Sequence, residues 1–331
     1  MTDDYLPGLS IGDPESDYAR DEVVDAFRRV DPDGRRAAAV FRSTFDQLYD
    51  GQHTGRYRWE QLYKTEKTHF GTLLEINLRR EFDDIIDDGQ LLDYRICGHD
   101  IDCKYSQRMG GWMLPPECFG QLLLVATASD EQSAWSLGVV RASDANRRTS
   151  ENRDGKTGLN SYGRQQVAWI RLEASLPPNV LLALDPVTLE SVFSPSSGQA
   201  RVTELLRRVT QRRIGRNTIA TVAQQDDYMA RVRDGNGART MLRPEGYLIP
   251  GGDYEAHREV ARRLGVEVPQ PGEVVSVRVV PASSNAPWTI ELEGRRWRVA
   301  GAAEESIEPA PKLPDTRKQK GAVADSPDEA P

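Results

Sequence analysis

Apolar residues recur at helical spacing in two stretches near the start of the chain. Within residues 35–48, Phe41, Phe45 and Leu48 fall on one face, which predicts a helix with one side in a core. A second helix is predicted from about residue 60 or 64 to residue 81, because small and apolar residues repeat there at the same spacing.

Residues 91–105 alternate as strands do and predict a hairpin joined at Gly98-His99. If the turn pairs Cys97 with Asp100, the rest of the register follows by counting. Successive side chains of a strand point to opposite faces, so one face is polar and the other apolar. The polar face carries Asp93 opposite Lys104, together with Asp102, and the apolar face carries Tyr94, Ile96, Ile101 and Cys103.

The rest of the chain changes from buried strands to short helices and then to strands. Apolar runs at residues 121–127 and 135–140 predict two buried strands. A later set of short helices followed by strands fits a winged helix-turn-helix. Its expected elements are helices at 201–213, 219–223 and 226–234, strands at 247–249 and 274–280, and a hairpin at Glu293-Gly294.

A chain of 331 residues is longer than one core usually supports, so two domains are expected. The acidic N-terminus and the Pro-rich, charged C-terminus favour mobile ends. The expected division is a mobile N-terminus at 1–22, a first domain at 23–170, a linker at 171–178, a second domain at 179–302 and a disordered tail at 303–331.

The net charge of −8 is unevenly distributed along the chain. Residues 1–22 carry −6 and residues 303–331 carry −3, which leaves +1 for the rest. Within that remainder, residues 195–243 hold ten Arg against four acids, a net of +6. The second domain therefore contains a strongly basic segment, as nucleic-acid-binding proteins do.

Other residue classes exclude several kinds of chemistry. Three cysteines without a C-x-x-C pair argue against a disulfide framework or a cysteine zinc site. The four histidines form no H-E-x-x-H motif, and there is neither a P-loop nor a G-x-S-x-G motif. The acidic N-terminal residues lack the basic region and apolar stretch typical of a signal peptide, and no apolar run is long enough for a membrane span, so a cytoplasmic protein is expected.

Glu75 is the unusual residue of the second predicted helix. At helical spacing it lies beside Gly71, Leu78 and Phe82, so its carboxylate is expected to be partly buried. A buried carboxylate is costly unless it is paired or binds a metal. The structural alternative is an ion pair with Arg79, one turn away.

The polar face of the hairpin, with Glu75 upstream, suits metal-dependent hydrolysis of phosphodiesters. Two neighbouring carboxylates provide the hard oxygen ligands that Mg²⁺ prefers. A nearby lysine can stabilise negative charge or help to activate the attacking water. The spacing D-x(8)-D-x-K alone is a weak signal, but Glu75 and the basic second domain make DNA hydrolysis the leading hypothesis.

Longer motifs identify a family resemblance. FDQLYDGQ (45–52), LYKTEKTHFGTLLEINLRREF (62–82), IDCKYS (101–106), WMLPPE (112–117) and ATVAQQDDYMARVR (220–233) closely resemble the NaeI family of type IIE restriction endonucleases. The resemblance implies an α/β (α+β) domain of the PD-(D/E)XK kind, followed by a winged helix-turn-helix domain. It also implies a homodimer that cuts double-stranded DNA with Mg²⁺, expected at GCCGGC. Cleavage would be stimulated by a second, effector copy of DNA bound at the C-terminal domain.

Carried over residue by residue, the resemblance assigns the catalytic acids to Glu75, Asp93 and Asp102, which would also be the metal ligands, and the catalytic lysine to Lys104. For the second domain, phosphate contacts are expected from Arg208, Arg212, Arg213 and Arg216, and base contacts from Gln224, Gln225 and Arg231. Two alternatives stay open: a DNA-binding regulator, or a nicking repair enzyme.

Overall fold

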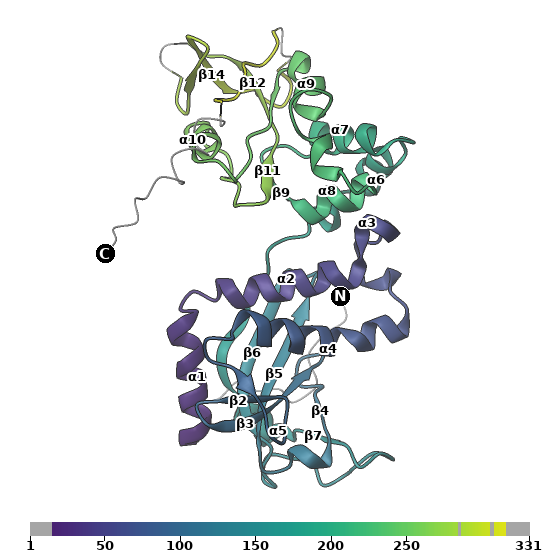
Figure 1. The fold of residues 1–331 in the computed structure, drawn as a ribbon, viewed down its shortest axis with the longest axis vertical. Coiled ribbons are helices and arrows are strands. Elements are labelled where there is room, and N and C mark those ends of the chain that lie inside the picture. Colours follow the sequence, from purple (N-terminus) through teal and green to yellow (C-terminus); the bar gives the residue numbers. More distant parts are fainter. Residues whose placement is uncertain (1–14, 284–285, 305–307, 316–331) are drawn as a thin grey trace, which may run out of the picture. The chain divides into compact units, whose positions relative to one another are not determined.

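A computed structural model describes residues 15–283, 286–304 and 308–315 of the chain (Figure 1). The chain divides into two compact units. The first unit comprises Met1–Tyr49 and Arg58–Pro178, and the second comprises Asp50–Tyr57 and Asn179–Pro331. Residues 50–57 therefore belong to the second unit, although in the sequence they lie between the two parts of the first unit. Among the described helices, none is long and apolar enough to cross a membrane.

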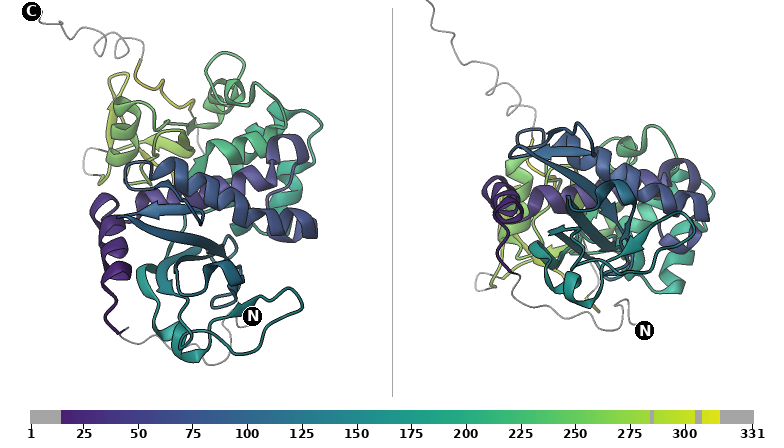
Figure 2. Two further views of the ribbon diagram at one scale, coloured as in Figure 1. Left: turned by 60° about the horizontal axis from the view of Figure 1, so that its bottom comes forward. Right: turned by 90° about the horizontal axis from the view of Figure 1, so that it is seen from below.

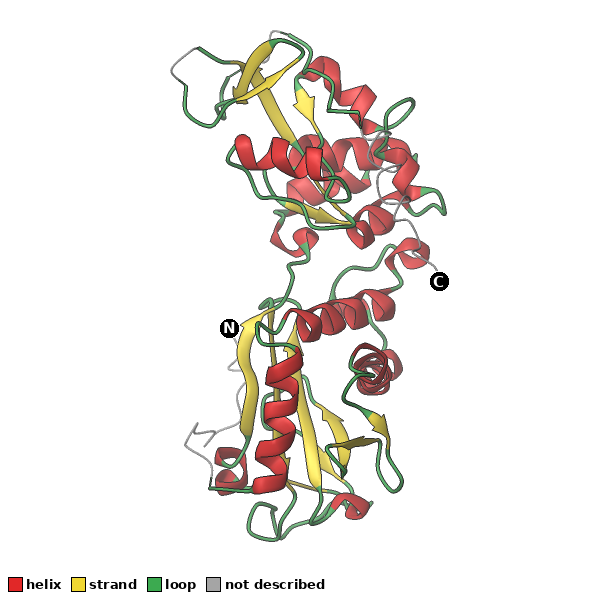
Figure 3. Ribbon diagram, turned by 60° about the vertical axis from the view of Figure 1, so that its left-hand side comes forward, coloured by secondary structure: helices red, strands yellow, loops and turns green. Residues whose placement is uncertain are grey.

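The first unit is built on one mixed, six-stranded sheet, visible as yellow strands in Figure 3. Its strands are antiparallel except for β3 and β5, which run parallel. A separate pair, β4 (Met113–Leu114) and β7 (Thr157–Gly158), lies outside that sheet. In spatial order the six strands are β1 (Asp87–Asp88), β2 (Tyr94–Ile96), β3 (His99–Tyr105), β5 (Leu122–Ser129), β6 (Ala134–Arg141) and β8 (Ala168–Ser175).

Three helices cover one face of this sheet, and loops cover the other. Along β5, Leu122 and Leu124 join the core beneath the helices, whereas Leu123 and Val125 join a second core with Trp112 and other loop residues. This alternation is the period of a strand buried on both faces. The helices are α1 (Tyr18–Val30), α2 (Arg35–Tyr49) and α4 (Lys64–Glu81). Helix α1, the darkest purple helix in Figure 2, packs on β6 and β8. The shorter ones are η1 (Trp59–Gln61), η2 (Pro116–Cys118) and α5 (Ser161–Gln165).

A buried ion pair ties α2 to the end of β5. Arg42 Nη1 lies 2.5 Å from Asp130 Oδ1, and the Tyr49 hydroxyl donates to Asp130 Oδ2 at 2.9 Å. The side chain of Asp130 is only 2 % exposed. Burial opposes the charge on Arg42, but Asp46 and Asp130 outweigh that effect and raise its pKa.

The hairpin forms, but its register differs from the prediction by two residues. Ile96 pairs with His99, and Arg95 pairs with Asp100, so the turn is Cys97-Gly98. Both turn residues have positive φ, 51° and 83°, as a two-residue turn of type I′ requires. A shift of two preserves which side chains share a face, so the predicted polar and apolar faces are unchanged.

The second unit combines a helical half with a small antiparallel sheet. The helical half contains α3 (Gly51–Thr54), η3 (Val180–Ala183), α6 (Pro186–Phe193), α7 (Gly198–Arg208), α8 (Arg216–Ala223), η4 (Tyr228–Arg231), α9 (Ala238–Leu242) and η5 (Arg243–Glu245). The rest contains α10 (Glu255–Arg263), the sheet β10 (Tyr247–Leu248), β12 (Val277–Pro281), β14 (Arg295–Val299) and β13 (Ile290–Leu292), and the pair β9 (Arg213–Gly215) and β11 (Glu273–Val275).

Residues 50–57, here called the α3 segment, are an integral part of the second unit. A Cβ atom on Gly51 would lie 2.0 Å from Thr221 Oγ1, so only glycine fits against α8. The backbone oxygen of Tyr57 accepts a hydrogen bond from Asn179 Nδ2 at 2.8 Å. The ring of Tyr57 stacks on the ring of Phe193, with the two centroids 5.7 Å apart. The α3 segment therefore contributes packing that residues 179 onward do not supply alone.

Several boundaries differ from those predicted. Helix α1 begins at Tyr18, so residues 18–22 are helical and not mobile, whereas residues 1–14 of the predicted mobile end lie outside the described residues. Residues 171–175 belong to β8 and not to a linker, because their backbone pairs with β6. In the predicted tail, residues 303–304 and 308–315 are described, and Ala310 is fully buried in the core of α10 and the sheet; residues 305–307 and 316–331 are not described.

The prediction of a helix at 226–234 is wrong, because only the 3₁₀ turn η4 forms in that stretch. Gln224, with φ of 51°, ends α8 in the left-handed conformation. Asp226, the expected cap of a further helix, instead accepts a hydrogen bond from Gln52 of the α3 segment at 3.0 Å. The predicted helix at 201–213 is α7, which ends at Arg208.

Candidate active site

Three elements of the first unit bring the predicted acidic residues and lysine together. Asp93 directly precedes β2, Asp102 and Lys104 lie on β3, and Glu75 lies on α4. Glu75, Asp93, Asp102 and Lys104 are close enough for their charges to influence one another. The sequence therefore predicted a set of residues that the fold does bring together.

Asp102 and Lys104 form a partly buried ion pair. Lys104 Nζ lies 2.7 Å from Asp102 Oδ2 and also donates to the backbone oxygen of Cys103 at 3.2 Å. The side chain of Asp102 is 6 % exposed and that of Lys104 is 23 % exposed. Burial opposes the positive charge of Lys104, but Asp102 and Asp93 outweigh this and raise its pKa, so the lysine is cationic at neutral pH.

Asp102 has little solvent to stabilise its charge. Its pKa is raised to about 6, chiefly by burial and also by Asp93, while Lys104 acts in the opposite direction. Asp93 is held in place by the opposite strand, since its Oδ2 accepts a hydrogen bond from Cys103 N at 2.8 Å. The hairpin thus fixes two carboxylates side by side, with one lysine to balance them.

Glu75 is half-buried and faces these groups from the helix. Burial raises its pKa, Asp93 raises it further, and Lys104 partly offsets both. The alternative ion pair with Arg79 does not form in the described structure, because Arg79 Nε lies 3.1 Å from Asp88 instead. Glu75 is therefore directed toward the site, as its position on the apolar stripe suggested.

Tyr94 is a residue of the site that sequence reasoning did not single out. Its buried hydroxyl donates to the backbone oxygen of Glu75 at 2.7 Å and so joins β2 to α4. Tyr94 directly follows Asp93, so its hydrogen bond connects the segment that carries Asp93 to the helix that carries Glu75. The sequence does contain a sign of this role, because Tyr94 lies on an apolar strand face and a buried tyrosine hydroxyl usually requires a hydrogen-bond partner.

The carboxylates of the site could bind a cation, but the described protein side chains alone do not supply a complete set of metal ligands. Among the described residues, no group of three or more His, Cys, Asp or Glu side chains is arranged to hold a metal ion. Two crowded carboxylates, one with a raised pKa, would nevertheless be stabilised by a divalent cation. Mg²⁺ commonly binds through one or two carboxylates and completes its shell with water and phosphate, so Asp93 and Asp102 fit such an ion.

The predicted DNA-contacting residues of the second unit occupy varied environments. Arg212 is exposed and forms no ion pair with any described residue, whereas Arg216 lies 3.9 Å from Asp253. Arg208 pairs with Glu204, Arg231 pairs with Asp227, and Arg213 lies 3.7 Å from Glu267 and from Glu273. Gln224 packs against Gly55 of the α3 segment, and Gln225 packs against Gly198.

Comparison with known proteins agrees with the geometry of the first unit. Residues 21–309 match the family described as Restriction endonuclease NaeI. The chain is also 48% identical, over 314 residues, to the type II restriction enzyme NaeI of Lentzea aerocolonigenes; the match covers 92% of this chain and 97% of that protein. Neither a DNA-binding regulator nor a nicking repair enzyme is favoured by these matches. The chain belongs to the NaeI family of type II restriction endonucleases, enzymes that hydrolyse DNA.

Proposed function

We propose that this restriction endonuclease cuts both strands of double-stranded DNA at a palindrome, with Mg²⁺ as its cofactor. The observation that carries the proposal is the ion pair of Asp102 and Lys104 beside Asp93, with Glu75 facing it from α4. The site expected from the family resemblance, GCCGGC, is the first one to test.

The four residues have separate roles in this proposal. Asp93 and Asp102 bind the metal ion, and Glu75 orients a water molecule or completes the ligand set. Lys104 lies beside the scissile phosphate, where its positive charge stabilises the negative charge that develops during hydrolysis. The metal ion supplies Lewis-acid polarisation of the phosphate and lowers the pKa of water.

The second unit is proposed to be a winged helix-turn-helix domain that binds an effector copy of DNA in a homodimer. The basic segment 195–243 supports DNA binding, and its arginines are proposed to contact phosphates. Arg212 is the best placed for this role, because it is exposed without an ion pair among the described residues. Arg208, Arg213 and Arg216 would first exchange a carboxylate for phosphate. Gln224 and Gln225 would turn toward base edges, as would Arg231 once it leaves Asp227.

The proposed activity is tested by digesting a plasmid of known sequence and mapping the ends. With Mg²⁺ we expect double-strand cuts at one palindrome, and with EDTA no cuts. A plasmid with a single site should be cut faster when a short duplex containing that site is added. Single-strand nicks alone would refute the cutting of both strands, and binding without cleavage in Mg²⁺ and in Mn²⁺ would refute the nuclease proposal. Cutting without stimulation would refute only the effector role.

Tyr94→Phe is expected to reduce the maximal cleavage rate about tenfold and to raise the Mg²⁺ concentration needed for half-maximal activity. The change removes one hydroxyl, which holds the backbone of Glu75 at 2.7 Å, and leaves the ring in the core. Cleavage rates measured across a Mg²⁺ titration test this.

Tyr105→Phe is a matched control for this positioning role, because its hydroxyl donates to Ala128 O at 3.2 Å, away from Glu75. Both variants should lose similar stability, and only Tyr94→Phe should shift the metal requirement. Equal kinetic effects of the two variants would contradict a positioning role for Tyr94.

A further inference from the structure

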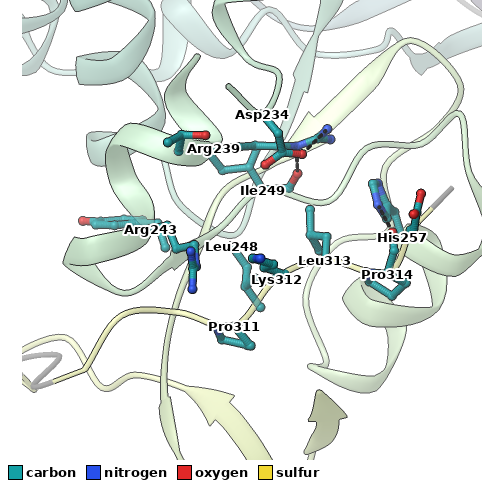
Figure 4. Close-up of a pocket in the computed structure, with 13 residues that line it drawn as sticks. Asp234, Arg239, Arg243, Leu248, Ile249, His257, Pro311, Lys312, Leu313 and Pro314 are labelled. Atoms are coloured by element: carbon teal, nitrogen blue, oxygen red, sulfur yellow. Dashed lines mark hydrogen bonds and ion pairs between the residues drawn. The ribbon is translucent and has the colours of Figure 1, made fainter. Parts of the chain in front are cut away.

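The second unit contains a cavity of about 610 Å³ that takes no part in the function proposed above. Residues 308–315 are here called the C-terminal strap. Its residues 311–315 form one wall of the cavity, and the region from Asp234 to Ile249 forms most of the rest (Figure 4). Ligand pockets in proteins commonly have volumes of about 300–1,000 Å³. The cavity is therefore large enough for a small organic molecule.

Three cationic side chains from three segments line this cavity: Arg239 on α9, Arg243 at the start of η5 and Lys312 on the strap. Two acids, Asp234 and Asp315, also line it, and both are exposed. His257 adds no charge at neutral pH, because burial and the neighbouring Arg239 lower its pKa to about 4. Lys312 is exposed like the two acids, so the positive charge in the inner part of the cavity comes from Arg239 and Arg243.

Arg239 is a largely buried charge whose one ion pair, with Asp234, is long. Its side chain is 15 % exposed, its Nε donates to the backbone oxygen of Ile249 at 2.9 Å, and the nearest paired carboxylate, of Asp234, is 4.0 Å away. The carboxylate itself is 79 % exposed, so solvent screens it. Burial lowers the pKa of Arg239, which is the direction expected for a guanidinium that an anion would stabilise.

Arg243 and Lys312 offer further donors to such an anion. Arg243 Nε donates to the backbone oxygen of Ala310 at 2.9 Å, and its other guanidinium nitrogens have no hydrogen-bond acceptor among the described residues. Lys312 forms no ion pair within the described part of the chain, and in Figure 4 its side chain lies among the lining residues. Two guanidinium groups and an ammonium group suit a dianionic phosphate better than a single carboxylate.

The remaining wall is apolar and so favours a ligand with a carbon part. Leu248, Ile249 and Leu313 line it, together with two prolines of the strap. A free inorganic phosphate would leave this surface and most of the volume unused. A DNA duplex, whose major groove alone is about 12 Å wide, is too large to enter such a cavity, so the DNA substrate is not its natural occupant.

We propose that this cavity binds a phosphomonoester of nucleotide size, with Arg239, Arg243 and Lys312 holding its phosphate and Leu248, Ile249 and Leu313 contacting its carbon part. Binding would also secure the strap, because Lys312 belongs to it and Arg243 holds Ala310. The backbone amide of Ala310 donates to Arg243 O at 2.8 Å, so ligand should slow hydrogen exchange at that amide.

The test is calorimetric titration of the full-length chain with four nucleoside 5′-monophosphates, AMP, GMP, CMP and dTMP, and with adenosine and inorganic phosphate for comparison. We expect at least one monophosphate to bind, adenosine not to bind, and Lys312→Gln to weaken binding about tenfold. Arg233→Gln is the control, since Arg233 is an exposed cation of the same region that does not line the cavity.

Four results would each overturn the proposal: no binding of any monophosphate up to about 1 mM, equal affinity for inorganic phosphate, equal weakening by the control variant, or displacement of the bound monophosphate by blunt duplex DNA without a terminal phosphate. The last outcome would mean that the cations belong to a DNA-binding surface. Hydrogen exchange at residues 308–315 gives a readout that is independent of cleavage.

Discussion

Asp102→Asn is expected to lower the rate of DNA cleavage by about 10³-fold or more while leaving DNA binding intact. The substitution keeps the size of the side chain and removes its negative charge. Asp102 then loses its ion pair with Lys104 at 2.7 Å and can no longer provide an anionic ligand for a cation. Because the DNA contacts proposed for the second unit are untouched, binding in EDTA should match that of the unmodified enzyme.

The control for this substitution is Asp88→Asn. Asp88 lies on β1 of the same sheet, but its carboxylate is 92 % exposed and pairs with Arg79. Its replacement should not change the cleavage rate. Plasmid cleavage under single-turnover conditions and a gel-shift assay measure the two quantities. Cleavage by Asp102→Asn at more than about a tenth of the normal rate would exclude Asp102 from the catalytic centre.

Asp130→Ala should be among the most destabilising single changes in the first unit. It leaves Arg42 buried with Asp46 as its remaining carboxylate and removes the acceptor of the Tyr49 hydroxyl. Breaking a buried pair by removing one partner costs about 3–5 kcal/mol. With about 3 kcal/mol lost, the melting temperature of this unit should fall by about 6–12 °C in scanning calorimetry.

Asp144→Ala provides the comparison for an exposed ion pair. Asp144 pairs with Arg147, but its side chain is 95 % exposed, so its loss should not measurably change the melting temperature. Asp130→Asn should fall between the two, because the amide oxygen still accepts hydrogen bonds but carries no charge. A melting temperature of Asp130→Ala equal to that of Asp144→Ala would show that the buried network contributes little.

The polar face of the hairpin could be predicted because alternation survives an error of two residues in register. The turn itself was missed, since Cys97 adopts positive φ, a conformation that a cysteine rarely favours. Strand β8 was taken in part for a linker because the stretch ends in Pro177-Pro178, and its pairing with β6 is irregular between Trp135 and Gly138. Such an irregularity breaks the alternation on which strand prediction depends.

Contacts distant in sequence account for the other errors. The α3 segment shows no local sign that it packs on α8, and the fit of Gly51 against Thr221 is evident only in three dimensions. The strap resembled a disordered tail because proline and charge dominate its composition, yet Ala310 is buried. Tyr94 was assigned to the apolar face correctly, but its hydrogen bond depends on how α4 crosses the sheet.

The α3 segment limits how this chain can be divided into separately expressed parts. The chain passes between the two units three times, after Tyr49, Tyr57 and Pro178. A gene fragment that begins at Asn179 would lack the partner of Phe193 and the backbone acceptor of Asn179, and would uncover Thr221. The two units are therefore not modules that can be exchanged between relatives at Pro178; a workable chimera must transplant residues 50–57 together with the C-terminal half.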